Sequence, residues 1–116
     1  MFDFQKLHVY QKSKDFRNSI KHLIIRSNFD RTTRDQISRA SMSIALNIAE
    51  SASRFSLKDR RNFIVIARGS VFECVAILEL LATNNEISKE EYEKFYSALE
   101  DISKMLFGLI KKLGKN

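Results

Sequence analysis

Histidine is the residue of this chain best suited to metal ligation, and its spacing does not suit that role. His8 and His22 are the only two histidines, and 14 residues of helix would separate them by about 21 Å. They cannot share one metal ion. Di-iron helical bundles use Glu-x-x-His pairs on two helices, and the sequence contains no such pair. We therefore expect neither a metal site nor a cofactor.

The candidate nucleophiles also lack the partners that would activate them. Cys74 has no histidine near it in the sequence and lies on a predicted apolar seam, where cysteine behaves as a small hydrophobe. Arg68 could pair with Glu73 or with a neighbouring subunit. No histidine or lysine pattern marks the serines of the central helices as nucleophiles, so we interpret them as small packing residues: Ser41, Ser43 and Ser70. We expect no catalytic residue and no enzyme.

Polar residues near the middle of the chain have a structural interpretation. Glu50 could form an ion pair with Arg54 or with Arg61 and so brace the turn that follows it. Asn47 lies among apolar residues, and we expect it to fix helix register through a buried hydrogen bond. An enzyme built on Asn47, Glu50 and Arg68 is the alternative, but it has no visible general base with a suitable partner.

Lysine and arginine are concentrated in the first part of the chain. Residues 1–68 contain 14 of them against 6 Asp and Glu, whereas residues 69–116 contain 6 against 8. The chain as a whole carries a formal net charge of +6. Basic side chains displace counterions from a nucleic-acid backbone without reading its sequence, so phosphate binding is the chemistry that this surplus could support.

The elements that must position these residues are helices. Proline is absent and glycine occurs three times, which favours a chain that is nearly all helix. Apolar residues recur at helical spacing in four segments, each preceded by an N-capping signal: Asp3, Thr33–Gln36, Ser56–Asp59 and Ser88–Glu91. The predicted helices run from about Phe4 to Asn28, Arg34 to Ala52, Leu57 to Asn84, and from just after Ser88 to Leu113, with Gly114 at the end.

Four helices joined by short loops predict an all-α, antiparallel up-down-up-down four-helix bundle, with residues 1–116 as one domain. The third helix has two apolar lines, and the second has no obvious place inside one bundle, so we expect a homo-oligomer. The members of this second line are Ile64, Val71, Val75 and Leu78.

The cellular setting is predicted from what the sequence lacks. One cysteine rules out an internal disulfide framework and fits a reducing compartment. No apolar run could span a bilayer, and no secretory signal is visible. We expect a cytoplasmic protein without membrane contact.

One end of such a bundle collects basic residues from three elements. The predicted nucleic-acid contacts there are Arg54, Lys58, Arg60, Arg61, Lys111, Lys112 and Lys115, with Lys6 beside them. A solvated bundle end is the alternative, with the lysines near Gly114 complementing a helix C-terminus. The opposite end should be neutral or acidic. Most aromatic residues fall on the predicted seams, so we expect neither base stacking nor sequence-specific readout.

Three stretches resemble one known family. Gln36–Glu50, followed by Arg54, resembles the signature of the 23S rRNA-intervening-sequence family of four-helix bundle proteins. Phe63–Ser70 with Glu73 is similar to that family's third helix, and Ile87–Ile110 to its fourth. The resemblance covers nearly the whole chain.

The chain departs from the family pattern at two places. Ser51 stands where the family usually has glycine, and Phe29-Asp30 stands where Phe-Pro is common. Both places are helix ends or turns. The departures therefore bear on loop geometry and not on the fold.

The resemblance implies a small bacterial protein without established enzymatic activity. Some members are encoded inside intervening sequences of 23S rRNA genes. A related branch, the accessory variability determinants of diversity-generating retroelements, forms pentamers and binds nucleic acid and a reverse transcriptase. Two hypotheses for the function are open. In the first, the chain is a homo-oligomeric protein, pentameric by resemblance, that binds structured RNA or an RNA–protein complex. In the second, it is a protein–protein scaffold for an acidic partner and does not bind nucleic acid.

Overall fold

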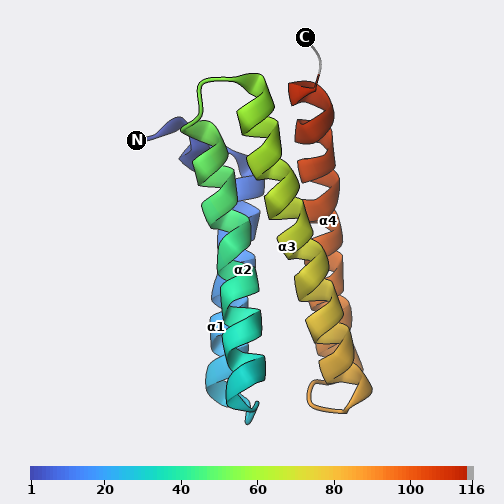
Figure 1. The fold of residues 1–116 in the computed structure, drawn as a ribbon. Helices are drawn as coiled ribbons and strands as arrows, with labels where there is room; N and C mark the ends of the chain where they lie inside the picture. The colour runs from blue at the N-terminus through green and yellow to red at the C-terminus, as the bar shows by residue number, and fades with distance from the viewer. Residues whose placement is uncertain (115–116) are drawn as a thin grey trace.

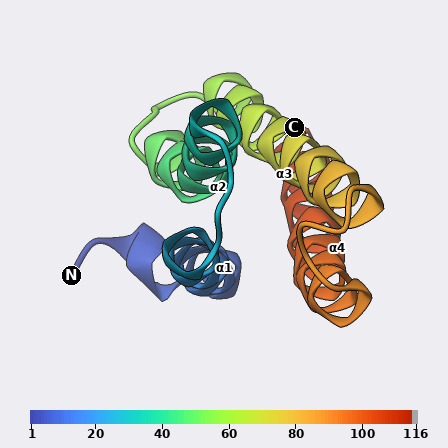
Figure 2. The same cartoon turned by 90° about the horizontal axis from the view of Figure 1, so that it is seen from below.

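The computed structural model describes residues 1–114 and contains four long helices: α1 (His8–Arg26), α2 (Arg31–Ala52), α3 (Leu57–Thr83) and α4 (Lys89–Leu113). They lie side by side in a bundle with principal extents of 46 × 24 × 22 Å (Figure 1). Consecutive helices are antiparallel neighbours, and α4 also contacts α1, so the helices follow one another around the bundle axis (Figure 2). The predicted all-α, up-down-up-down four-helix bundle is confirmed.

The core is built from apolar lines at the predicted spacing. Burying one Leu, Ile or Phe side chain contributes roughly 1.5–3 kcal/mol, so these lines are what hold the bundle together. In α1 the buried residues are Val9, Ser13, Phe16, Ile20 and Leu23, which recur at the helical spacing that the sequence predicts. In α4 they are Phe95, Leu99, Ile102 and Leu106, again as predicted.

Helix α3 differs from the prediction, because its second apolar line lies inside the bundle. Ile64, Val71 and Leu78 are at most 2% exposed. The expectation was wrong because α3 contacts α2 on one side and α4 on the other, and each contact needs an apolar line. The exposed apolar residues of α3 lie elsewhere, at Leu57, Val65, Ile66, Phe72 and Leu80.

The beginning of α1 was also predicted wrongly. Residues Asp3–Lys6 form a short 3₁₀ helix, and α1 begins only at His8 and ends at Arg26. Asp3 therefore does not cap α1. Its carboxylate lies 3.9 Å from the ammonium group of Lys6.

Asp30 caps α2, which begins earlier than predicted. The Asp30 carboxylate accepts a hydrogen bond of 2.7 Å from the backbone N–H of Thr33, which satisfies one free donor of the first turn. The helix consequently starts at Arg31, and the capping box predicted from Thr33 to Gln36 is not what opens it. Asp30, which stands where proline is common in the family that the chain resembles, thus supplies the N-cap of α2.

The two remaining helix starts agree with the sequence. At the start of α3, the Ser56 hydroxyl accepts from the backbone N–H of Asp59 at 3.0 Å. At the start of α4, Ser88 and Glu91 form a reciprocal capping box, with bonds of 3.1 and 3.4 Å. Helix α3 ends at Thr83, and α4 ends at Leu113 with Gly114 as its C-cap.

Candidate nucleic-acid interface

Cys74 is unsuited to nucleophilic chemistry. Its side chain is 0% exposed, and burial, aided by the charge of Glu73, raises the pKa of the thiol to about 12. The thiol is therefore neutral and out of reach of a substrate. Within residues 1–114, no group of three or more His, Cys, Asp or Glu side chains is gathered as metal ligands would be.

The serines connect helices, and Asn47 contacts one of them. The Arg17 guanidinium on α1 donates to the hydroxyl of Ser41 on α2 at 2.9 Å. The Ser70 hydroxyl on α3 donates to that of Ser43 on α2 at 2.8 Å, and Asn47 donates to the same oxygen at 2.9 Å. Asn47 thus influences the register between α2 and α3 only through Ser43, because its own bonds stay within α2.

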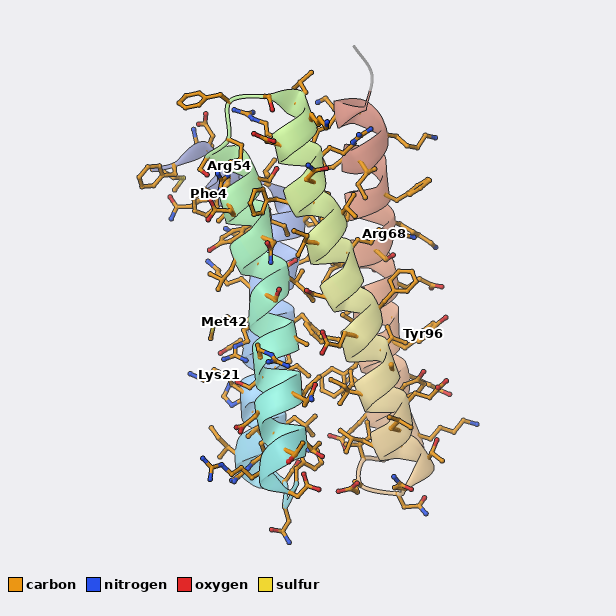
Figure 3. All side chains as sticks on the ribbon, viewed as in Figure 1. Phe4, Lys21, Met42, Arg54, Arg68 and Tyr96 are labelled. Carbon is orange, nitrogen blue, oxygen red and sulfur yellow. The ribbon has the colours of Figure 1, made fainter. Side chains whose placement is uncertain are left out.

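The structure brings the predicted basic residues to one end of the bundle, which we call the basic end. The first residues, the α2–α3 turn and the last turn of α4 meet there (Figure 1). Figure 3 shows Arg54 and Phe4 at this end. Lys115 lies outside the residues that the structure describes. The described cations of the basic end are Lys6, Arg54, Lys58, Arg60, Arg61, Lys111 and Lys112, against the carboxylates of Asp3, Glu50 and Asp59.

A set of side-chain to backbone hydrogen bonds fixes the α2–α3 turn. The Ser51 hydroxyl donates to the carbonyl of Arg60 at 2.8 Å, joining the end of α2 to the start of α3. The Arg60 Nε donates back to the carbonyl of Arg54 at 2.7 Å. Arg60 therefore helps to hold the turn through its Nε, and Ser51, which stands where the family usually has glycine, is part of the same set of hydrogen bonds.

Arg54 is a second brace. Its guanidinium pairs with Glu50 at 2.8 Å, one of the two ion pairs proposed from the sequence. It also lies over the ring of Phe63, with 4.5 Å between the guanidinium carbon and the ring centroid. Arg54 contributes positive charge to the basic end, but a phosphate would have to compete with Glu50 for it.

Apart from Arg60, which bonds to a backbone carbonyl, four cations of the basic end have no carboxylate partner within residues 1–114: Lys58, Arg61, Lys111 and Lys112. Arg61 lies in the first turns of α3, and its guanidinium reaches the α4 terminus near Gly114. Lys111 and Lys112 are exposed in the last turn of α4. These side chains form the part of the basic end that is free to contact phosphate.

The opposite end, which we call the acidic end, contains the α1–α2 and α3–α4 connections (Figure 1). Its carboxylates, Asp30, Asp35, Glu86, Glu90, Glu91 and Glu93, outnumber its cations, Arg26, Arg31, Arg34 and Lys89. The Arg26 guanidinium pairs with Glu91, and this hydrogen bond holds the pKa of the Glu91 carboxyl below its usual value. Arg31 lies 3.9 Å from Asp35. The backbone N–H of Thr33 lowers the pKa of Asp30 in the same way. This end therefore has little positive charge to offer a polyanion.

The expectation that aromatic rings lie mostly on the seams was wrong for several phenylalanines. Phe55 follows Arg54 in the α2–α3 turn, and its side chain is 102% exposed. Position 55 lies between helices and belongs to no apolar line, so helical periodicity gives no signal for its exposure. The other exposed phenylalanines are Phe2, Phe72 and Phe107.

Arg68 lies on a second surface, formed by α3 and α4. It pairs with no carboxylate in the described part of the chain, so the predicted pairing with Glu73 is not formed. Its guanidinium carbon lies 4.8 Å from the ring centroid of Phe72 and 5.3 Å from that of Phe107, while its buried Nε lacks a hydrogen-bond partner. We call this surface, marked by Arg68 in Figure 3, the Arg68 face; it comprises Val65, Arg68, Gly69, Phe72, Phe107 and Ile110.

The chain is similar to one known family in both sequence and fold. A family model described as 23S rRNA-intervening sequence protein matches residues 5–108. The crystal structure of a protein of unknown function from the S23 ribosomal protein family of Bacteroides thetaiotaomicron is similar at 30% identity with a TM-score of 0.84, covering 89% of this chain and 98% of that one. None of the curated proteins matches. None of the helices described is long and apolar enough to cross a membrane.

Proposed function

Since this chain belongs to the 23S rRNA-intervening sequence protein family, we propose that it is a non-catalytic, homo-oligomeric protein that binds structured RNA through the basic end of its bundle. The observation that carries the proposal is the set of four cations at one end without carboxylate partners in the described residues, while at the acidic end the carboxylates outnumber the cations. Phosphate oxygens are the ligands that such a surplus suits. The buried single thiol is compatible with the cytoplasmic location that we propose with it.

The contacts that we assign to phosphate are Lys58, Arg61, Lys111 and Lys112. Arg61 on α3 and the two lysines on α4 approach from adjacent helices, so one phosphate backbone could pass over both. Arg54 and Arg60 support these contacts by fixing the turn. Such binding reads charge and shape, because none of these side chains is held in a geometry that would select a base.

Salt dependence of RNA binding tests this assignment. We would compare the wild type with the Arg61→Ala/Lys111→Ala/Lys112→Ala variant on a structured ribosomal RNA fragment. Each lost phosphate contact lowers the salt slope by about 1, so the variant's slope should be smaller by about three. Replacing Arg54 or Arg60 would be less informative, because the turn itself would change.

A matched variant removes three cations from the acidic end: Arg31→Ala/Arg34→Ala/Lys89→Ala. It has the same change in net charge, so a general effect of charge would weaken both variants equally. The proposal expects the control to bind as the wild type does, apart from a small long-range effect. Equal slopes for all three proteins, or no binding at moderate salt, would leave the basic end as a solvated helix terminus.

Homo-oligomerisation is the second part of the proposal, and the Arg68 face is the surface that we assign to it. The face exposes two phenylalanine rings around an arginine whose Nε has no hydrogen-bond partner in the described residues. A Cβ added at Gly69 would meet no atom within 4 Å, so another helix could approach closely there. A subunit count of five comes from the family resemblance, and a ring would multiply weak RNA contacts through avidity.

Light scattering on two matched variants tests the interface. Phe72 and Leu46 are 57% and 58% exposed on different helices. We expect Phe72→Glu to dissociate the oligomer and Leu46→Glu to leave it intact. A monomeric wild type would refute the oligomer, and dissociation by Leu46→Glu alone would move the interface to α2.

A protein scaffold is the second candidate function, and the same face favours it. An acidic protein partner could supply a carboxylate to Arg68, which has none in the described residues. Two results together would support the scaffold over RNA binding. The wild type would be a monomer that retains an acidic protein partner and whose RNA binding does not depend on salt, and the Arg68→Ala variant would lose that partner.

A further inference from the structure

Phe55 is exposed to an extent that the fold does not require. Its ring is 102% exposed, whereas the phenylalanines of the core are at most 9% exposed. A phenyl ring in water gives up the roughly 1.5–3 kcal/mol that burial would contribute. Position 55 thus gains nothing in the folded chain from carrying an aromatic side chain.

The backbone that presents this ring is firmly held on both sides. Before it, the Ser53 hydroxyl donates to the carbonyl of Glu50 at 2.7 Å, and Arg54 pairs with Glu50. After it, Ser56 caps α3, and Arg60 bonds back to the Arg54 carbonyl. The ring is therefore displayed on a fixed turn, so little entropy of the turn is lost when the ring contacts a ligand.

The charges around the ring indicate the ligand. Phe55 lies between Arg54 and Lys58 in sequence, at the end of the bundle where Arg61 and the lysines of α4 also lie. Cations that hold a phosphate backbone next to an exposed aromatic ring are the combination used to bind unpaired nucleotides. We infer that Phe55 is a stacking platform for an unpaired base of RNA held at the basic end, an inference that rests on the proposed function.

An unpaired base fits this ring better than a duplex or a lipid surface does. The faces of paired bases are already covered by their neighbours in the helix, whereas bases in loops and bulges can leave the stack. Membrane-surface binding needs a broad apolar face on an amphipathic helix, and Phe55 stands in a turn between Arg54 and Ser56. The RNA class selected by this site is therefore one with a single-stranded loop, bulge or end.

Replacement of the ring is the first test. The loss of one aromatic–base stack weakens binding by roughly tenfold. We expect Phe55→Ala to bind a single-stranded oligonucleotide about tenfold more weakly, with an unchanged salt slope and with duplex binding unaffected. Phe55→Tyr should restore binding and Phe55→Leu should not, because leucine is apolar but has no π face. Ile25→Ala, which removes an exposed apolar residue from the last turns of α1, should bind as the wild type does.

A tryptophan reporter gives the second test. The chain contains no tryptophan, so Phe55→Trp would carry the only one. Stacking on a base should quench its fluorescence upon addition of single-stranded RNA, and less so with duplex.

Four results would overturn the inference, and they can be told apart. Wild-type binding that is steeply salt-dependent and unchanged in Phe55→Ala would leave the proposed function intact and remove the platform. A change of oligomeric state in Phe55→Ala would make the ring a subunit contact. A response of the Phe55→Trp fluorescence to anionic vesicles and not to RNA would assign the ring to a membrane surface. If the wild type binds no RNA at any salt concentration, the proposed function fails and the platform fails with it.

Discussion

Phe29 and Phe55 occupy corresponding places at the two ends of the bundle and have opposite environments. Each lies in a short connection between two helices, Phe29 between α1 and α2 and Phe55 between α2 and α3. Phe29 is 5% exposed and belongs to the core, whereas Phe55 contacts mainly solvent. The acidic end closes the core with its loop residues, and Ile87 in the α3–α4 connection is buried there as well. The basic end instead presents its loop residue outward.

The charges differ in the same sense. At the acidic end, Arg26 pairs with Glu91, and Asp30 caps a helix. At the basic end, pairing and capping hold the turn, but the cations around it outnumber the carboxylates. The acidic end has more carboxylates than cations and buries its loop phenylalanine, whereas the basic end leaves an aromatic ring and several cations for contact with another molecule.

The largest expected difference between the ends is the cost of removing each phenylalanine. Phe29→Ala should lower the free energy of unfolding by about 3–5 kcal/mol, because the substitution leaves a cavity in the core. Phe55→Ala should change it by less than about 0.5 kcal/mol, since surface substitutions rarely do more. Urea denaturation at one protein concentration measures both. Similar costs for the two substitutions would contradict the comparison.

The helix caps should show a smaller difference. Ser88→Ala removes half of a reciprocal capping box at the acidic end, and Ser56→Ala removes a single bond at the basic end. Each should cost about 1 kcal/mol, because each removes one side-chain acceptor for a backbone N–H of the first turn, while the backbone N–H of Ser88 can still donate to Glu91. Thermal unfolding of both variants measures the two losses, and a loss confined to one variant would show that only that end depends on its cap.

The smallest expected effect is a pH dependence of the acidic end. The pKa of Glu91 is lower in the folded protein than in the unfolded chain, so its ionised form stabilises the fold above the unfolded pKa of about 4.3. This stability is lost as the pH falls below that value. Because the pair with Arg26 is partly exposed, it should be worth up to about 1 kcal/mol.

The Glu91→Gln variant measures that dependence. It should be less stable than the wild type at pH 7, and the difference should shrink below about pH 4. Glu90→Gln, in the same first turn of α4, is the control and should show a smaller change. A difference that persists unchanged at low pH would mean that Glu91 acts through packing and not through its charge.

The fold could be predicted well because helix periodicity and capping are local. The seam of α1 and the capping box at Ser88 follow directly from residues three or four positions apart. The start of α2 could not be fixed in this way, because Asp30 and Thr33 both resemble caps and only the chain geometry selects one. The second line of α3 was misplaced because its burial depends on α2 and α4, which local spacing does not place.

The candidate site could be predicted only as a set of charges. Topology brought the basic residues to one end, but their roles depend on distances that spacing does not give. Arg54 and Arg60 proved to brace the turn, which leaves Lys58, Arg61 and the α4 lysines for phosphate. The exposure of Phe55 is a tertiary property, because an apolar residue in a loop can fold inward, as Phe29 does.

An NMR titration with single-stranded RNA would test most directly whether the basic end is the end that contacts RNA. The account predicts that shifts concentrate in the amides of residues 53–61 and 109–114 and in the ring of Phe55, while the amides of residues 27–34 and 84–91 stay in place. Shifts at the acidic end, or shifts confined to the Arg68 face, would contradict it.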